Sequence, residues 1–435
     1  MKSNKSLYTL EIYESEDRYK NRKSRSKDKY RNPRKNSKND KFKYSNRKSS
    51  SVDLYFNGTL IRVWSPTIKQ EKDVLKSLKR LSKYPDIYPY IAIMPDYHIG
   101  ENSVIGSVIP SERLLYVNAL GGDLGCGIAS LRLPIKVESI TNNLRDIYNN
   151  IHSRVPCGRR LNIRFSEEVM KMPIFQRDIE VLNKSNTRTA MQQLGTLGSG
   201  NHFIEIQKGD DEKINLMVHS GSRELGQIIR KMFSNKAKSI NSPNGIIAIP
   251  ADSQEGKDYM EHMKLALEYS KANRFEILRQ SYNAFQENIP GFNIPFEESL
   301  EGLIDIPHNQ ITREDHFGRS VYVHRKGAIY LLENDVGIIP GSMGTSSYLV
   351  LGRGNRFSFN SCSHGAGRKM SRGKALNTIN MSDYLRSMEG IIGRNDHNIL
   401  DEAPQAYKDI DQVIKDQRDL IKIYERLKPL ASIKG

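Results

Sequence analysis

The sequence predicts an α+β fold, because apolar strands and amphipathic helices alternate along the chain without a regular βαβ rhythm. Residues 60–64 and 90–94 are short apolar runs typical of strands, whereas residues 258–288 carry the longest helical pattern, which ends at Pro290 and Gly291. The chain of 435 residues is long enough for one large domain or for two or three ordinary ones.

The composition indicates a soluble protein of a reducing compartment. No stretch approaches the ~18 apolar residues of a membrane span, and the N-terminus lacks the apolar core of a signal peptide. The three cysteines, Cys126, Cys157 and Cys362, make no disulfide framework. We therefore expect a cytoplasmic protein with no membrane partner, and the nucleus is the alternative because the N-terminus is strongly basic.

Positive charge is concentrated at the N-terminus. Residues 1–50 hold 17 Lys+Arg against 6 Asp+Glu, so they carry 11 of the 17 net positive charges of the chain. Such a segment buries too little apolar surface to fold alone, so we predict a disordered tail over residues 1–51 and a folded domain over residues 52–435. The tail fits a nucleic-acid-binding arm that neutralises phosphates, and equally a solubilising or targeting extension.

The folded part is expected to begin with short elements and an acid–histidine motif. After the strand at 60–64, residues 72–81 have apolar side chains at helical spacing, and a proline ends that helix. The strand at 90–94 runs into Asp96 and His98, which could face a site at the edge of a sheet. A turn with an N-terminal aspartate is the alternative.

Four glycines in seven residues surround Asp123 and Cys126, after a strand expected at 103–109. A thiolate selects a soft or borderline transition metal, and the carboxylate would be the oxygen ligand beside it. Without partners, the same loop is a tight turn with a buried cysteine.

A second glycine-rich loop follows an amphipathic helix around residues 140–151. Residues 194–206 open into a strand that carries Asn201, His202 and Glu205. No helix follows and no Lys-Ser/Thr pair is present, so the loop is neither a P-loop nor a dinucleotide fingerprint.

Three more histidines differ in their surroundings. The strand at 216–219 ends in His219 and continues into Ser-Gly-Ser-Arg223, which fits a metal ligand beside an anion-binding nest. His262 lies among charged residues of the long helix and is interpreted as a surface residue. His308 stands alone and, by itself, is typical of a turn.

Two later segments suit phosphate groups. A strand at 321–324 enters a basic turn with Arg325 and Lys326. A serine- and glycine-rich loop over residues 338–348 has hydroxyls and amides that could hold the phosphates or the base of a nucleotide.

The stretch from Asn360 to Arg372 reads N-S-C-S-H-G-A-G-R-K-M-S-R and places His364 among small residues. Histidine can act as a covalent nucleophile as well as an acid, a base or a metal ligand. Arg368 and Arg372 supply guanidinium forks suited to phosphate. Taken alone, the stretch also fits a glycine-rich turn with a surface histidine.

A C-terminal helix is predicted after Tyr407, because the apolar residues there have helical spacing. These residues are Val413, Ile414, Leu420, Ile421 and Leu427.

Together the motifs supply more metal ligands than one closed zinc site needs. The chain offers one aspartate, one cysteine and three histidines, namely Asp123, Cys126, His202, His219 and His308. This set is enough for two metals that share a bridging thiolate. With phosphate-handling loops and a reachable histidine, it predicts a metal-dependent enzyme acting on phosphate esters, with nucleic acid as a candidate substrate.

The order of the motifs resembles that of the RtcB family of RNA ligases, from about Leu60 to Gly435. The matching motifs are MPDYHIG, GGDLGCGI, LGTLGSGNHFIEI, HSGSRELG, HRKGAI, IIPGSMGTSSY and SCSHGAGRKMSR. The resemblance implies a single compact domain of stacked β-sheets flanked by helices, and we expect a monomer. It also implies an enzyme of tRNA splicing or RNA repair that joins 3′-phosphate or 2′,3′-cyclic-phosphate RNA ends to 5′-hydroxyl ends.

The resemblance further implies how the reaction proceeds. His364 would attack the α-phosphate of GTP to form a histidine–GMP phosphoramidate, with Asp96 required beside it. GMP would then pass to the RNA 3′-phosphate and be displaced by the 5′-hydroxyl. The implied ligands of two Mn²⁺ ions are Cys126 as the bridge, Asp123 and His202 on one ion, and His219 and His308 on the other.

Nucleotide and RNA contacts are implied on several loops, with Glu205 as the candidate acceptor for the guanine edge. The nucleotide contacts are Asn201, Glu205, His308, Asn309, Pro340, Gly341, Ser342, Met343, Ser347, His364, Gly365, Ala366, Gly367, Tyr407 and Lys434. Contacts to RNA or phosphate are expected from Arg223, Arg325, Lys326 and Arg368. The expected partners are RNA, as tRNA halves or broken RNA, and an archease-like activator.

Two features depart from the family pattern. Gly100-Glu101-Asn102 replaces a sequence like G-K-G, and Glu224 stands where glycine is usual. Neither change touches a metal ligand or His364, so activity is expected to survive. Glu101 removes a positive charge near the expected RNA path, and we hypothesise that the basic tail compensates by binding RNA.

Two other functional classes compete with ligation. An RNA-binding or RNA-sensing homologue that has lost ligation would not need the ligands, His364 or Lys434. A metal-dependent RNA phosphodiesterase would need the metals but not His364, Glu205 or Lys434. The substitution His364→Ala therefore separates a phosphodiesterase from a ligase.

Overall fold

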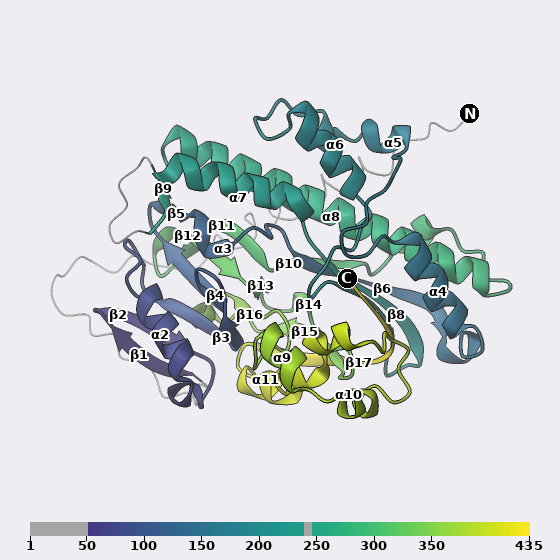
Figure 1. Ribbon diagram of the computed structural model, residues 1–435. Coiled ribbons are helices and arrows are strands. Elements are labelled where there is room, and N and C mark those ends of the chain that lie inside the picture. Colours follow the sequence, from purple (N-terminus) through teal and green to yellow (C-terminus); the bar gives the residue numbers. More distant parts are fainter. Residues whose placement is uncertain (1–50, 239–245) are drawn as a thin grey trace, which may run out of the picture.

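The computed structural model describes residues 51–238 and 246–435, so residues 1–50 of the tail predicted over residues 1–51 lie outside the described residues. The described chain contains two large β-sheets, and helices lie mainly on the outside of them (Figure 1). The α+β prediction is therefore confirmed.

The first sheet has six strands and holds the N-terminal part of the described chain. Its order is β1 (Val52–Phe56), β2 (Thr59–Val63), β3 (Ile91–Ile99), β4 (Val104–Ser111), β12 (Arg319–Lys326) and β11 (Asn309–His316). Only β2 and β3 pair in parallel, and the other neighbours are antiparallel. Asp96 and His98 lie within β3, not beyond its end, because the strand continues past a register shift between Ile93 and His98.

The second sheet has seven antiparallel strands. Its order is β10 (Ile304–Pro307), β6 (Gly127–Lys136), β8 (Lys213–Ser220), β7 (Phe203–Lys208), β17 (Ile421–Lys434), β15 (Ser347–Gly352) and β14 (Val336–Ile339). Two small ladders pair β13 (Ala328–Tyr330) with β16 (Ser361–Ser363) and β5 (Leu114–Tyr116) with β9 (Ala248–Pro250).

The two large sheets meet at His308. This residue alone separates β10, in the seven-stranded sheet, from β11, in the six-stranded sheet. Its backbone N–H donates to the carbonyl of Cys126 at 2.8 Å, and Pro307 pairs with Gly127. The junction therefore places His308 beside the loop that carries the predicted thiolate.

The longest helix of the described chain, α8 (Gln254–Asn288), confirms the helical pattern predicted at 258–288. Ser253 caps it by accepting a hydrogen bond from the Gly256 N–H at 3.0 Å. Its buried Ile277 and Tyr282 pack with apolar residues of β6 and β8. Figure 1 shows α8 alongside α7 on one side of the molecule.

Shorter helices complete the described fold. They are α2 (Lys72–Leu81), α3 (Val117–Leu120), α4 (Leu144–Arg154), α5 (Glu167–Met170), α6 (Lys184–Gln193), α7 (Arg223–Lys238), α9 (Arg372–Thr378), α10 (Met381–Ser387) and α11 (Ile410–Asp416). Among the described segments, no helix combines the length and the apolarity needed to cross a membrane.

The predicted C-terminal helix is only partly correct. Helix α11 ends at Asp416, and Ile421–Lys434 forms β17, which pairs with β15 on one side and β7 on the other. Leu427 is buried against other strands of the seven-stranded sheet as part of this strand and not of a helix. The spacing of the apolar residues fits both structures, and pairing with strands distant in the sequence decides the outcome.

The interpretation of His262 as a surface residue is wrong. Its side chain is buried, with its ring edge against Phe233 and Nδ1 bonded to the Asp258 carbonyl at 2.7 Å. The neighbouring charged residues Glu261 and Lys264 are exposed on other faces of α8.

Candidate metal and nucleotide site

Four of the predicted metal ligands converge at one edge of the seven-stranded sheet. Cys126 Sγ lies 3.2 Å from His219 Nε2 and 3.5 Å from His202 Nε2. Asp123 Oδ2 lies 3.2 Å from His202 Nε2. The ligand atoms of Cys126, His202 and His219 all lie within 4.8 Å of one another, a spacing that suits a shared metal ion.

Sheet register explains this convergence. His219, at the end of β8, lies opposite Ile128 of β6 and opposite Phe203 of β7. Cys126 and His202 directly precede those two strands. Three residues that are far apart in the sequence therefore reach the same corner of the sheet.

Backbone carbonyls orient two of the histidine rings. His202 Nδ1 lies 2.8 Å from the Leu197 carbonyl, and His219 Nδ1 lies 3.2 Å from the Asn201 carbonyl. A carbonyl accepts only if Nδ1 carries the proton, so Nε2 of each ring is left with the lone pair that faces Cys126. Metal-binding histidines are commonly oriented in this way.

His308 extends the cluster toward His364. Its ring centre lies 5.1 Å from that of His219 and 4.8 Å from that of His364. Its Nδ1 is buried and has no hydrogen-bond partner within the described chain. A buried nitrogen without a partner is costly in a protein, and a metal ion would satisfy it.

The electrostatics of the cluster suit a divalent cation. Burial lowers the pKa of His219 and His308 well below the usual range, so both rings are neutral and able to coordinate. Burial raises the pKa of Asp123, but the neighbouring His202, Cys126 and His219 together outweigh this and the net pKa falls to about 2. Burial raises the pKa of the Cys126 thiol well above its usual value, and a coordinated metal would reverse that effect. This donor set fits transition-metal binding.

A residue of α8 that could not be singled out from the sequence holds the loops of the candidate metal ligands in place. The fully buried Arg274 donates from Nη1 to the carbonyls of Gly125, at 2.9 Å, and Ser220, at 3.0 Å. Its other nitrogens bond to both carboxylate oxygens of Asp305, at 2.5 and 2.9 Å. The sequence does hold one signal of this role, because an arginine stands among the apolar residues in the middle of α8.

His364 follows β16 and is held by Asp96 of β3. The His364 and Gly365 N–H groups donate to Asp96 Oδ2 at 3.0 and 3.3 Å, and His364 Nδ1 lies 2.5 Å from the same oxygen. Gly367 has φ +73°, and a Cβ there would lie 2.0 Å from the Asp96 carbonyl oxygen. The close approach of the two segments therefore requires glycine.

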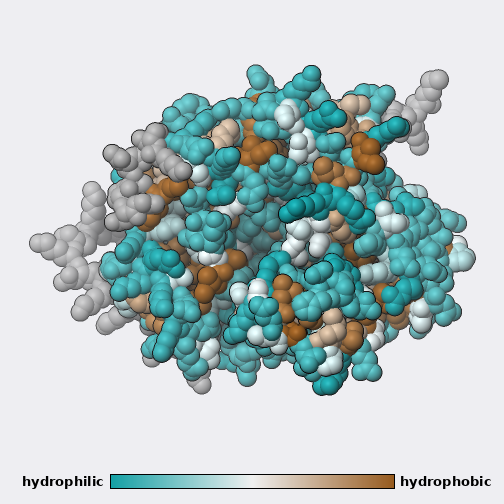
Figure 2. All heavy atoms as spheres, in the orientation of Figure 1, coloured by the Kyte–Doolittle hydropathy of each residue, from teal (hydrophilic) through white to brown (hydrophobic). Residues whose placement is uncertain are grey.

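A cleft of about 1280 Å³ joins these groups and is larger than typical small-ligand pockets. Figure 2 shows a hollow in the centre of one face, rimmed mainly by hydrophilic residues. The predicted residues that line the cleft are Asp123, Cys126, Asn201, Glu205, His219, His308, Asn309, Lys326, Pro340, Gly341, Ser342, Met343, His364, Gly365, Ala366, Gly367, Arg368, Tyr407 and Lys434. The predicted residues outside its lining are Asp96, His202, Arg223, Arg325 and Ser347.

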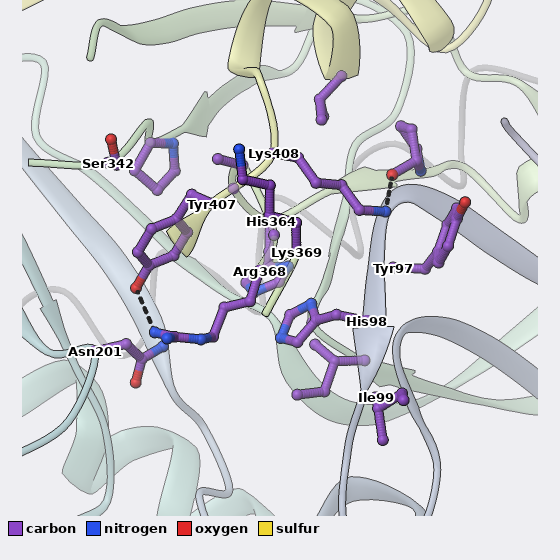
Figure 3. Close-up of a pocket in the computed structure, with 18 of the residues that line it drawn as sticks. Tyr97, His98, Ile99, Asn201, Ser342, His364, Arg368, Lys369, Tyr407 and Lys408 are labelled. Atoms are coloured by element: carbon purple, nitrogen blue, oxygen red, sulfur yellow. Dashed lines mark hydrogen bonds between the residues drawn. The ribbon is translucent and has the colours of Figure 1, made fainter. Parts of the chain in front are cut away.

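Glu402, which the sequence analysis also missed, gathers several predicted residues at one end of the cleft. Its carboxylate accepts from the Tyr407 hydroxyl at 2.6 Å, from Lys434 Nζ at 3.0 Å and from Arg368 Nη1 at 3.1 Å. Arg368 also donates to the Tyr407 hydroxyl at 3.4 Å (Figure 3). The guanidinium of Arg368 is thus largely occupied by protein groups.

Glu205 lies on β7 and lines the cleft. Burial raises its pKa to about 7, and this exceeds the opposing effects of Lys434 and the amide of Gln207. Gln207 donates to Oε2 at 2.7 Å, and Ser432 donates to Oε1 at 3.3 Å.

Ser347 supports the serine- and glycine-rich loop from behind. Its buried hydroxyl accepts from the Gly341 N–H at 3.2 Å and from the Gln207 amide at 3.0 Å. Its neighbour in the predicted nucleotide set, Ser342, lines the cleft.

The predicted RNA-binding residues separate into reachable and buried groups. Lys326 lines the cleft, and burial lowers its pKa to about 8. Arg223 lies beside the glycine-rich loop, where Nε donates to Thr196 Oγ1 at 3.1 Å. Arg325 is fully buried and paired with Glu314, so its prediction as an RNA contact is not retained. It lies in strand β12, where alternate side chains point into the protein, and not in a basic turn.

The fold and the site define an α+β protein with a candidate transition-metal centre inside a polar cleft. The chain belongs to the family described as tRNA-splicing ligase RtcB, which matches residues 77–435. It is 34% identical over 402 residues to RNA-splicing ligase RtcB of Escherichia coli K12, covering 86% of this chain and 97% of the relative. The family resemblance of the motifs is confirmed.

Archaeal relatives match over a similar extent. The chain is 29% identical over 464 residues to tRNA-splicing ligase RtcB of Nanoarchaeum equitans, covering 88% of this chain and 95% of the relative. It is 30% identical over 443 residues to tRNA-splicing ligase RtcB of Archaeoglobus fulgidus, covering 84% of this chain and 92% of the relative.

Proposed function

We propose that this protein is a GTP- and Mn²⁺-dependent RNA ligase that joins 3′-phosphate or 2′,3′-cyclic-phosphate ends to 5′-hydroxyl ends. The observation that carries the proposal is His364, a cleft-lining histidine whose Nδ1 lies 2.5 Å from a buried carboxylate and whose ring is adjacent to the candidate metal cluster. The names of the relatives, which are splicing ligases, support the reaction class.

Two Mn²⁺ ions would be held by the clustered side chains, with Cys126 as the shared ligand. Asp123 and His202 would complete one ion, and His219 and His308 the other. When bound, the ions would neutralise phosphate charge and orient the leaving pyrophosphate.

Asp96 prepares His364 for nucleophilic attack. Asp96 Oδ2 lies 2.5 Å from Nδ1 and favours the tautomer with the proton on Nδ1, which leaves Nε2 with its lone pair. In the proposed first step, Nε2 forms a bond to the α-phosphorus of GTP, the bond from that phosphorus to the bridging oxygen breaks, and pyrophosphate leaves. Glu205 would accept from the guanine edge, while Tyr407 and Lys434 contact the nucleotide.

The two RNA steps would take place at the same site as the attack by His364. An oxygen of the RNA 3′-phosphate attacks the phosphorus of GMP and the bond to Nε2 breaks, which leaves an activated phosphoanhydride on the RNA. The 5′-hydroxyl oxygen then attacks the RNA phosphorus, its proton is lost and GMP leaves. A cyclic end would first be hydrolysed at this site.

The test compares wild type with His364→Ala on a cyclic-phosphate RNA and a 5′-hydroxyl RNA, with GTP and Mn²⁺. We expect joined RNA from wild type, and a loss of at least about 1,000-fold in the variant with opening of the cyclic phosphate retained. The matched control is His397→Ala, because His397 is an exposed histidine outside the cleft lining. Undiminished joining by His364→Ala would refute the proposal, and GTP-independent hydrolysis without joining by wild type would favour a phosphodiesterase. Each reaction is also run with an archease-like activator.

A further inference from the structure

An arginine-rich loop lies outside the catalytic cleft, over residues 156–165. Arg159, Arg160 and Arg164 are exposed, and no acidic residue occurs within the loop. In the described parts of the chain, none of the three takes part in an ion pair, and the hydrogen bond of Arg160 is to the Cys157 carbonyl of its own loop at 3.4 Å. The loop therefore presents three uncompensated guanidinium groups to solvent.

Hydrogen bonds attach this loop to the glycine-rich segment of the site. The Gly158 N–H donates to the Gly198 carbonyl at 2.7 Å, and the Leu197 N–H donates to the Pro156 carbonyl at 2.9 Å. Asn201, which lines the cleft, follows three residues after Gly198. The arginine-rich loop consequently lies at the rim of the cleft.

A further arginine lies between the loop and the cleft. Arg372 lines the cleft, and its guanidinium lies beside Gly200, within 3.5 Å of the position that a Cβ would occupy there. Arg372 therefore lies between the loop and the cleft, where Asp401 and Glu402 balance its charge.

Apolar side chains lie between the charges of the loop. Leu161 is 42% exposed and Ile163 is 92% exposed. An extended strand of RNA has ribose and base surfaces that can cover such side chains while its phosphates contact arginine.

We propose that loop 156–165 binds the phosphate backbone of the substrate RNA at a distance from the end that is joined. The inference rests on the proposed function and extends it to an RNA-binding surface outside the cleft. Guanidinium forks match phosphate oxygens, and such contacts position a nucleic acid without reading its sequence. The loop would therefore strengthen binding of long RNAs and leave the chemistry at His364 unchanged.

The test replaces all three arginines in the full chain, as Arg159→Gln, Arg160→Gln and Arg164→Gln. Affinity for a single-stranded RNA of about 30 nucleotides is measured by fluorescence anisotropy over a series of salt concentrations. We expect the slope of log affinity against log salt to fall in magnitude by about 2, since each single-strand phosphate contact contributes about 0.7. A triple Arg→Lys variant, which keeps the charges, should retain most of the slope.

A charge-matched control removes three exposed cations elsewhere, as Arg418→Gln, Lys422→Gln and Lys428→Gln. Its salt slope should equal that of wild type. A wild-type slope in the loop variant, or an equal loss in the control, would overturn the proposal.

Transfer of labelled GMP to the protein separates this inference from the proposed function. The loop variant should accept label as wild type does, and should join RNAs with ends of about four nucleotides at the wild-type rate. If wild type accepts no label, the proposed function fails, and the salt slopes still decide whether the loop binds RNA. If the variant joins long RNAs as well as wild type does, the inference fails although the ligase function stands.

Discussion

Glu205 and Glu402 are both buried near Lys434 at one end of the cleft, yet their pKa values move in opposite directions. Burial raises the pKa of Glu205 to about 7. Burial also acts to raise the pKa of Glu402, but Lys434 and Arg372 outweigh it and the net pKa is lowered. One carboxyl is therefore near its titration point at neutral pH, and the other is a permanent anion that gathers cations.

This contrast predicts how stability depends on pH. The folded state keeps a proton on Glu205 above the pH at which the unfolded chain releases it, so wild type loses stability as pH rises from about 5 to 7. Glu205→Gln removes this loss. We expect the stability of the variant relative to wild type to increase by up to about 3 kcal/mol between pH 5 and 8, measured by urea unfolding.

Glu402→Gln is the matched control, because the folded state favours the ionised form of this group. Its stabilisation is complete above the unfolded pKa and is lost only at lower pH. The control should therefore be less stable than wild type by a nearly constant amount from pH 5 to 8. If the stabilities of the two variants depended on pH in the same way, the opposite pKa shifts of Glu205 and Glu402 would be contradicted.

At the scale of elements, α8 links the long-helix pattern of the sequence to the geometry of the site. Arg274 donates to the carbonyls of Gly125 and Ser220, which lie next to the candidate ligands Cys126 and His219. A helix that packs against the sheet can hold loops that have no regular structure of their own.

Arg274→Lys tests this role of α8. Lysine keeps a positive charge opposite Asp305 but lacks the planar fork that reaches both carbonyls. We expect Mn²⁺ affinity to fall by about 10- to 100-fold while circular dichroism reports an intact fold. Arg279→Lys, on the same helix and paired with Glu276 at a partly exposed position, should bind Mn²⁺ as wild type does. Equal affinities of the two variants would mean that Arg274 does not position the ligands.

Strand β17 shows the limit of local pattern. Its apolar spacing predicted a helix, but each edge pairs with a strand from another part of the chain. Helices α2 and α8 were predictable because their periodicity is local, whereas β17 depends on partners that no short window of sequence contains.

At the scale of the whole molecule, the two sheets meet where His308 and Cys126 lie together. A metal bound there would tie together segments from both sheets. Metal binding should therefore stabilise the whole fold and not one loop alone.

Thermal and chemical unfolding can measure this coupling. At a free Mn²⁺ concentration 100 times the dissociation constant, one site should add about 2.7 kcal/mol to the unfolding free energy. Cys126→Ser should abolish most of this gain because Cys126 is the proposed shared ligand, and a chelator should reverse it in wild type. Cys157→Ser, at a cysteine outside the cluster, should keep the full Mn²⁺-dependent gain in unfolding free energy. Loss of the gain in that control would contradict the proposal that Cys126 is the shared metal ligand.

The residues of the site were predictable to the extent that their chemistry is rare and their motifs are long. Cys126, His202 and His219 stand in glycine-rich or strand-end positions, and the structure brings them together. Glu402 and Arg274 escaped notice because they stand in no motif, and their roles depend on contacts between distant segments. Arg325 was misassigned because its motif does not reveal that its side chain points into the protein.

The most direct test of the ligase account is the site of covalent GMP attachment. Wild type is incubated with α-labelled GTP and Mn²⁺, digested, and the labelled peptide is identified by mass spectrometry. We predict an acid-labile, alkali-stable adduct on His364, absent from His364→Ala and retained in His397→Ala. An adduct on another residue, or joining of RNA without any adduct, would contradict the account.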